Sequence, residues 1–119
     1  FFISEGDFMN RNELLKRLMN KPVKFTVDGY GDYFVKGMNT MDYLFAAAQS
    51  ETDEHGNMNQ ESYFAALVVR CVLDENKQRL FKDEDMQILK EADISFVLPL
   101  ALKVQELSNL STGEDLKKN

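Results

Sequence analysis

Residues 60–73, QESYFAALVVRCVL, decide the fold that the sequence predicts. Written as a helix, this segment has apolar side chains on nearly every side, and Arg70 is the one charge within its apolar part. A helix that is apolar all round lies in the interior of a domain. We therefore expect this helix at the centre of the molecule, with the other elements packed around it.

Two helices are predicted ahead of this central helix. Asn10 or Asn12 can cap a short helix, and residues 20–22, NKP, end it because proline cannot continue the hydrogen-bond ladder. Asn39 or Thr40 can cap the second helix. The apolar residues expected at helical spacing are Leu14, Leu15 and Leu18 in the first helix and Met41, Leu44, Phe45 and Ala48 in the second.

Two further helices are predicted after the central one. Residues 74–76, DEN, end the central helix, and Asp83 can cap the next. Ser95 can cap the last helix, which places Pro99 in its first turn, where a missing N–H costs little, and continues to about Ser108. The inward residues of the helix after Asp83 are Met86, Leu89 and Ala92.

Between the first two helices the apolar period changes to that of a strand. Apolar residues from Val23 to Val27 alternate with polar ones, which is typical of a half-buried strand. Residues 28–31, DGYG, supply the glycines of a tight turn, and residues 33–38 are aromatic and β-branched enough to return as a partner strand. The sequence therefore predicts a β-hairpin at about residues 23–38.

Together these elements predict a mainly α protein with one small β-hairpin, an α+β fold with a body of about four to five helices. The 119 residues, 44% of them apolar and 29% charged, fit a single globular domain over residues 1–119. Polar residues at about 109–119 are expected to form a mobile tail.

Composition excludes several classes of function. The net charge of −6 argues against general binding to nucleic acid or to anionic membranes, because both need a basic face. The single cysteine, Cys71, forms no intramolecular disulfide and fits a reducing compartment. The chain begins at Phe1, and it shows neither a signal-peptide pattern nor an apolar run of the ~20 residues that span a membrane. We expect a soluble, acidic, cytoplasmic protein.

The clustered carboxylates of residues 74–85 do not predict a metal site. A calcium loop of the EF-hand type needs glycine at its sixth position and glutamate at its twelfth. Gly56 as the sixth residue puts Ser62 at the twelfth, and residues 74–85 contain no glycine. We interpret these carboxylates as helix ends, with Leu80 and Phe81 fixing the connection to the core.

No catalytic residue, cofactor or metal is expected elsewhere. His55 is the one histidine and has no cysteine or histidine at metal-ligand spacing. Cys71 lies in the most apolar helix, where thiols are usually inert. Gly29 and Gly31 lie between two strands rather than between a strand and a helix, so they do not form a phosphate loop.

One feature exceeds what a small core needs. Residues 94–104, ISFVLPLALKV, have apolar side chains on every side of their predicted helix, and residues 41–48 show the same excess more weakly. The last helix is either fully buried or contacts another chain with part of its surface. The candidate residues for contact with a partner or with a second copy are Met41, Tyr43, Leu44, Phe45, Phe96, Leu98 and Leu102.

Two blocks resemble the tail assembly chaperones of long-tailed (siphovirus-type) bacteriophages. Residues 31–48, GDYFVKGMNTMDYLFAAA, are similar to that family's glycine-bounded strand and its capped helix with an acidic residue before an aromatic one. Residues 61–89, ESYFAALVVRCVLDENKQRLFKDEDMQIL, are similar to its apolar helix, Asp-led turn, Leu-Phe pair and the start of its next helix. The turn departs from the pattern, because the family often has glycine where Asn76-Lys77 stands.

The resemblance implies a non-enzymatic protein of the host cytoplasm. Such chaperones self-associate around the long helical tape measure protein, keep its apolar stripes from aggregating, and help deliver tail tube proteins. They leave before the virion matures, so the resemblance also implies absence from the mature virion. An acidic subunit with spare apolar surface suits this task, because many weak contacts in a row give avidity.

Two hypotheses from other classes remain. An acidic interaction module could inhibit a host DNA-binding protein, with Glu51, Asp53, Glu54 and Glu61 imitating phosphates, although the acidic residues are scattered rather than gathered in one stripe. A small enzyme is disfavoured by the missing site chemistry. Neighbouring genes for a tail tube protein and for a very long helical protein would favour the chaperone.

The last three residues generate a prediction about the gene. Members of the resembled family are often made in two lengths by a one-base ribosomal slip near the end of the gene. Residues 117–119, KKN, can be encoded by a run of adenines that permits such a slip, although an ordinary basic tail explains them as well. If the slip occurs, the gene has this run and an overlapping open frame beyond it. AAG codons that break the run would contradict the prediction.

Overall fold

A computed structural model describes residues 8–50, 55–56 and 59–108 of the chain. Within these ranges it has five α-helices, one 3-10 turn and one three-stranded antiparallel sheet with the strand order β1-β2-β3. The predicted α+β class with a mainly helical body is confirmed. The expected tail at 109–119 lies outside the described residues, as do residues 51–54 and 57–58 of the polar segment before the central helix.

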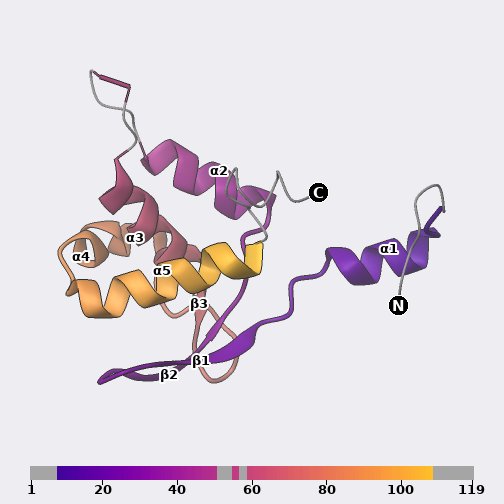
Figure 1. The fold of residues 1–119 in the computed structure, drawn as a ribbon, viewed down its shortest axis with the longest axis horizontal. Helices are drawn as coiled ribbons and strands as arrows, with labels where there is room; N and C mark the ends of the chain where they lie inside the picture. Colours follow the sequence, from indigo (N-terminus) through magenta and orange to yellow (C-terminus); the bar gives the residue numbers. More distant parts are fainter. Residues whose placement is uncertain (1–7, 51–54, 57–58, 109–119) are drawn as a thin grey trace.

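The predicted central helix is the core of the molecule. α3 (Gln60–Cys71) packs against α2 (Thr40–Gln49), α4 (Met86–Lys90) and α5 (Ile94–Ser108), and Figure 1 shows it between α2 and α5. Two small residues in its middle, Ala65 and Ala66, leave room for the neighbouring helices. Its buried residues are Ser62, Ala65, Ala66, Leu67, Val68, Val69 and Cys71.

The predicted hairpin is also present. β1 (Val23–Val27) pairs antiparallel with β2 (Gly31–Val35), in a register that sets Val23 opposite Val35 and Val27 opposite Gly31. Gly29 and Gly31 have φ angles of 86° and 98°, which residues other than glycine rarely adopt. The turn chemistry read from residues 28–31 therefore fixes this pairing.

The end of the central helix differs from the prediction. The helix was expected to reach Leu73, but it ends at Cys71, and β3 (Val72–Leu73) pairs with β2. The backbone N–H of Lys36 donates to the carbonyl of Cys71 at 3.0 Å. A β-branched valine beside an unpaired strand edge gains ladder hydrogen bonds that a further helical residue would forgo. The hairpin therefore becomes a three-stranded sheet.

The DEN segment closes a turn rather than ending a helix. The carboxylate of Asp74 accepts hydrogen bonds from the backbone N–H groups of Asn76 at 2.8 Å and Gln78 at 3.1 Å. Lys77 has a φ of 62°, the one positive value at a non-glycine position in the described ranges. Half of the expected anchor that follows is confirmed, because Phe81 packs on the core while Leu80 is exposed.

Two helix caps differ from the predicted ones. η1 (Asp83–Asp85), the 3-10 turn, is held by Asp85, whose carboxylate accepts from the backbone N–H of Lys82 at 2.8 Å. Asp83, the expected cap, instead forms ion pairs with Arg70 and Arg79. At α5 the carboxylate of Asp93 accepts from the N–H of Ser95 at 3.0 Å, so Asp93 rather than Ser95 serves the helix start.

Pro99 lies deeper in the last helix than expected. It is inside α5 rather than in the first turn, so its missing N–H leaves the carbonyl one turn earlier without its helical donor. The four residues that pack α5 on the core, Val97, Leu100, Ala101 and Val104, are all buried. Burial of this face holds the helix together despite the lost hydrogen bond.

The C-terminal end of α5 meets the segment between β2 and α2. Gly37 is buried there, and a Cβ on it would lie 2.8 Å from the backbone oxygen of Leu107. The N–H of Met38 donates to the hydroxyl of Ser108 at 2.8 Å. No side chain fits at position 37 without a backbone shift, which gives this glycine a packing role.

The first helix stands apart from the body. α1 (Arg11–Leu18) is capped by Asn10, one of the two residues that the sequence allowed, whose side chain accepts from the N–H of Glu13 at 2.9 Å. None of its residues is buried, and Figure 1 shows it projecting away from the sheet and the other helices. The predicted leucine stripe therefore exists but contributes nothing to the described core.

The central position of α3 predicts the effect of one substitution. Leu67→Asp should lower the free energy of unfolding by at least about 4 kcal/mol, because it buries a charge without a partner. Leu67 is 1% exposed, so the new carboxylate has no route to water. Urea unfolding followed by circular dichroism measures the change.

Leu80→Asp is the matched control, because the same change is made at an exposed leucine. It should alter the free energy of unfolding by less than about 1 kcal/mol. Equal stability of the two variants would show that α3 is not the centre of the core.

Candidate functional site

α2 exposes an apolar face. Met41 is 64% exposed, and Leu44, three residues later on the same side of the helix, is 54% exposed. Tyr43 is also exposed, but on a different side of the helix. The opposite side of the helix carries Asp42 and Ala46, both buried. We call Met41 and Leu44 the α2 face, because these two of the sequence-predicted contact residues lie together on one exposed side of the helix.

Asp42 caps the helix that carries this face. The side chain of Asn39 accepts from the N–H of Asp42 at 2.8 Å, and the carboxylate of Asp42 accepts from the N–H of Asn39 at 3.1 Å. This reciprocal pair is a capping box. It confirms Asn39 as the cap, one of the two residues that the sequence allowed.

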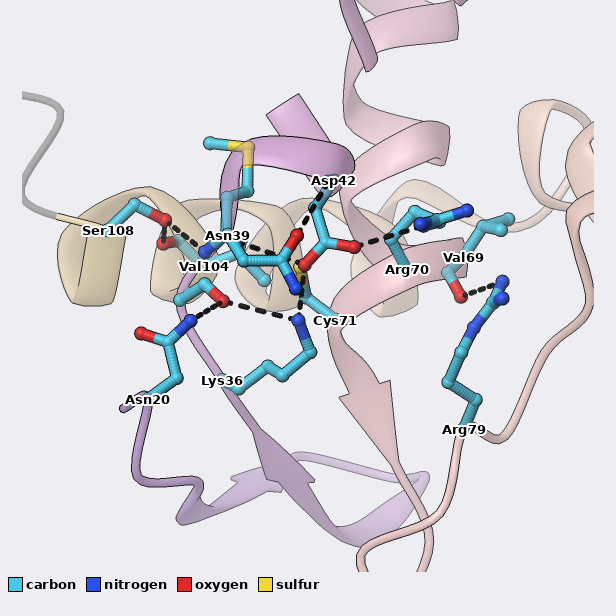
Figure 2. Close-up of polar contacts among 12 residues, drawn as sticks. Asn20, Lys36, Asn39, Asp42, Val69, Arg70, Cys71, Arg79, Val104 and Ser108 are labelled. Carbon is cyan, nitrogen blue, oxygen red and sulfur yellow. Dashed lines mark hydrogen bonds and ion pairs between the residues drawn. The ribbon is translucent and has the colours of Figure 1, made fainter. Parts of the chain in front are cut away.

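The same carboxylate is buried and forms ion pairs with two basic side chains. Asp42 is 4% exposed, and it forms an ion pair with the ammonium of Lys36 and accepts from Nε of Arg70 at 3.0 Å. The thiol of Cys71 donates to it at 3.7 Å. Figure 2 shows these groups converging on Asp42 from the segment after β2, from α2 and from α3. One carboxylate therefore joins the sheet, the exposed helix and the central helix.

Opposing effects act on the pKa of Asp42. Burial disfavours the charged form, but hydrogen bonds from Lys36, from the backbone of Asn39 and from Arg70 favour it and hold the pKa below its usual range. Asp42 is consequently ionised at neutral pH. It neutralises cations inside the fold and has no proton to exchange near pH 7.

Arg70 carries the network outward to the surface. Its Nη1 lies 3.1 Å from a carboxylate oxygen of Asp83, and Arg79 donates to the same carboxylate at 2.6 Å and to the carbonyl of Val69 at 3.1 Å. The guanidinium of Arg70 also lies over the ring of Phe45, 5.0 Å from its centroid. Phe45, predicted as a contact residue, therefore packs inward beneath α2.

Of the contact residues predicted on α5, one packs inward, one is half-buried and one is exposed. Phe96 faces the hairpin, with ring centroids 5.1 Å from Tyr30, 5.8 Å from Tyr33 and 6.3 Å from Phe81. Leu98 is half-buried and Leu102 is exposed. Leu102 thus faces solvent, while Phe96 packs against the hairpin.

The structure offers little for catalytic chemistry in its described part. Burial raises the pKa of the Cys71 thiol to about 12, so the thiol stays protonated and unreactive. Within residues 8–50, 55–56 and 59–108, no group of three histidine, cysteine or acidic side chains could hold a metal ion. None of the helices in these ranges is long and apolar enough to cross a membrane.

Sequence reasoning missed the ion network and the exposure of α1. Asn39 and Asp42 have the spacing of a capping box, so that part was visible in the sequence. Nothing local marks Arg70, 28 residues from Asp42, as its partner. Of the acidic residues considered as phosphate mimics, Glu61 is exposed, and the other three lie outside the described residues.

No family model, curated protein or solved structure matches this chain. Function therefore has to be inferred from the residue patterns and the geometry described above.

Removing the buried carboxylate of Asp42 should destabilise the fold by an amount that depends on pH. Asp42→Asn should lower the free energy of unfolding at pH 7 by about 3 kcal/mol, because it leaves Lys36 and Arg70 without their shared anion. The folded-state pKa of Asp42 is lower than the unfolded value near 3.8, so its stabilisation is complete above that value. It is lost as the pH falls, and the difference between wild type and variant should shrink below about pH 4. Urea unfolding at several pH values measures it.

Asp83→Asn is the control, because Asp83 binds the same arginine from the exposed side. A half-exposed ion pair contributes at most about 1 kcal/mol, so this variant should remain close to wild type at pH 7. If both variants lost the same stability, the buried carboxylate would have no special role.

Proposed function

We propose that this protein is a non-enzymatic tail assembly chaperone of a long-tailed bacteriophage. In this proposal it self-associates, binds the tape measure protein and helps recruit tail tube subunits. It acts in the host cytoplasm during tail assembly and is absent from the mature virion. The alternative is an acidic inhibitor; of its four proposed phosphate mimics, Glu61 is exposed and the other three lie outside the described residues.

The observation that carries the proposal is the exposed α2 face. Met41 and Leu44 are apolar and more than half exposed, and the one acidic side chain of α2, Asp42, is turned into the core. A neutral, apolar helix face suits packing against an apolar stripe of another helix. The capping box and the ion pairs of Asp42 hold this face rigidly, which lowers the entropy lost when a partner binds.

The backbone at one turn adds support to the resemblance. The resembled family often has glycine at the place of Asn76-Lys77, and Lys77 has a φ of 62°, which glycine adopts without strain. The turn of this chain therefore has the shape that glycine would favour, although its residues differ. The block from residue 61 to residue 89 keeps its resemblance through this departure.

A small subunit with one apolar face would bind its substrate through many copies side by side. A single contact of two or three apolar side chains binds weakly, whereas many copies along one long helical protein bind with high avidity. Weak individual contacts also let the coat leave when tail tube subunits assemble.

Co-expression with the tape measure protein encoded in the same genome tests the proposal. Wild-type chain should keep the tape measure protein soluble and co-purify with it. Met41→Asp combined with Leu44→Asp should weaken co-purification by at least about tenfold, since two exposed apolar contacts are lost. The fraction of soluble tape measure protein is the measurement.

Leu80→Asp, at an exposed leucine outside the α2 face, should behave as wild type. A tape measure protein that stays insoluble beside the wild-type chain, or a genome without one, would overturn the proposed function.

A further inference from the structure

α1 presents apolar side chains that no described residue buries. Leu14, Leu15 and Leu18 form its leucine face, and Leu18 is 65% exposed. A helix of eight residues is unstable in water by itself, because nucleation costs more than so few hydrogen bonds return. Its stability therefore requires a surface that covers the leucine face.

The charge of α1 is opposite to that of the body. Residues 8–21 contain four basic residues and one acidic residue, whereas residues 22–108 contain eight basic residues and fifteen acidic ones. Arg11 and Lys16 lie on α1 itself. A basic, leucine-bearing helix is complementary to an apolar surface with an acidic border.

The outer side of α5 is such a surface. Ile94, Leu98 and Leu102 follow one another at intervals of four residues, and we call them the α5 stripe. Ile94 and Leu102 are exposed and Leu98 is half-buried. Three exposed carboxylates lie close to the stripe in the chain, at Glu91, Asp93 and Glu106. Glu106 forms an ion pair with Lys103, so Glu91 and Asp93, beside the beginning of the stripe, provide its acidic border. The α2 face lacks such a border, since Asp42 is buried, so charge favours α5.

α1, which we call the arm, cannot reach the first residue of the α5 stripe in its own chain. The side chain of Asn20 donates to the carbonyl of Gly37 at 3.1 Å, and Gly37 packs on Leu107 at the far end of α5. Ile94 lies about 20 Å from Leu107 along the helix, whereas α1 is about 12 Å long. A tether fixed at Asn20 therefore leaves the beginning of the stripe out of reach.

We propose that α1 of one copy docks on the α5 stripe of a second copy. The leucine face covers Ile94, Leu98 and Leu102, and the basic residues of the arm face the acidic border. Because arm and stripe are different surfaces, the contact is head-to-tail and repeats along a chain or closes into a ring. This proposal rests on the self-association within the proposed function but needs no tape measure protein.

Sedimentation velocity over a wide range of protein concentration tests the docking. Wild type should associate as concentration rises, and added salt should weaken the association. Leu14→Glu with Leu18→Glu, the arm variant, should raise the dissociation constant at least tenfold. Ile94→Lys with Leu102→Lys, the stripe variant, should do the same. Circular dichroism should show both variants folded, since all four positions are exposed.

A mixture of the two variants decides whether arm meets stripe. The stripe variant keeps an intact arm and the arm variant keeps an intact stripe, so the mixture should form a complex although neither variant does so alone. Leu80→Glu, a change at an exposed leucine outside both surfaces, should associate as wild type.

A wild type that stays monomeric at millimolar concentration would overturn the proposal, as would an arm variant that associates normally or a mixture that stays monomeric. Loss of tape measure binding with intact association would overturn the proposed function alone.

Discussion

The structure depends on one buried carboxylate, that of Asp42. It caps α2 through Asn39 and forms ion pairs with Lys36, just after β2, and with Arg70 on α3. A buried charge is tolerated only where partners satisfy it, so these elements must meet in one arrangement. That arrangement turns Phe45 beneath α2 and leaves Met41 and Leu44 in solvent. The orientation of the exposed face is thus a consequence of the ion cluster.

The body of the protein presents apolar surface on two of the helices that pack against α3. α3 supplies an interior of small and β-branched residues, and α2 and α5 each bury one side against it. The other sides of both helices carry apolar residues that the described core does not need. A monomer rarely exposes such side chains on two separate helices and an arm without a partner for them. The self-association and the helical substrate proposed above would cover all three surfaces.

The exposed surfaces differ in charge, so the partners proposed for them differ. The α2 face is neutral and suits an apolar helix of any charge, whereas the α5 stripe has acidic neighbours and suits the basic arm. Self-association through arm and stripe would leave the α2 face of every copy open. A repeating chain of copies would then present a row of apolar faces to a long helical protein.

The sequence by itself determined the elements whose signals are local. The apolar helix predicted over residues 60–73, observed over 60–71, and the glycines of the hairpin turn have signals in neighbouring residues. The same holds for the helix starts, where the sequence narrowed each cap to two residues and the structure has Asn10 and Asn39. Of the contact residues, the sequence identified the helices but not which side faces out. Only the tertiary structure decided that Val72 joins a strand, that Phe96 packs on the hairpin and that α1 stands free of the described core. These outcomes depend on partners far along the chain, as when Met38 meets Ser108 across 70 residues, and no local pattern encodes such a distance.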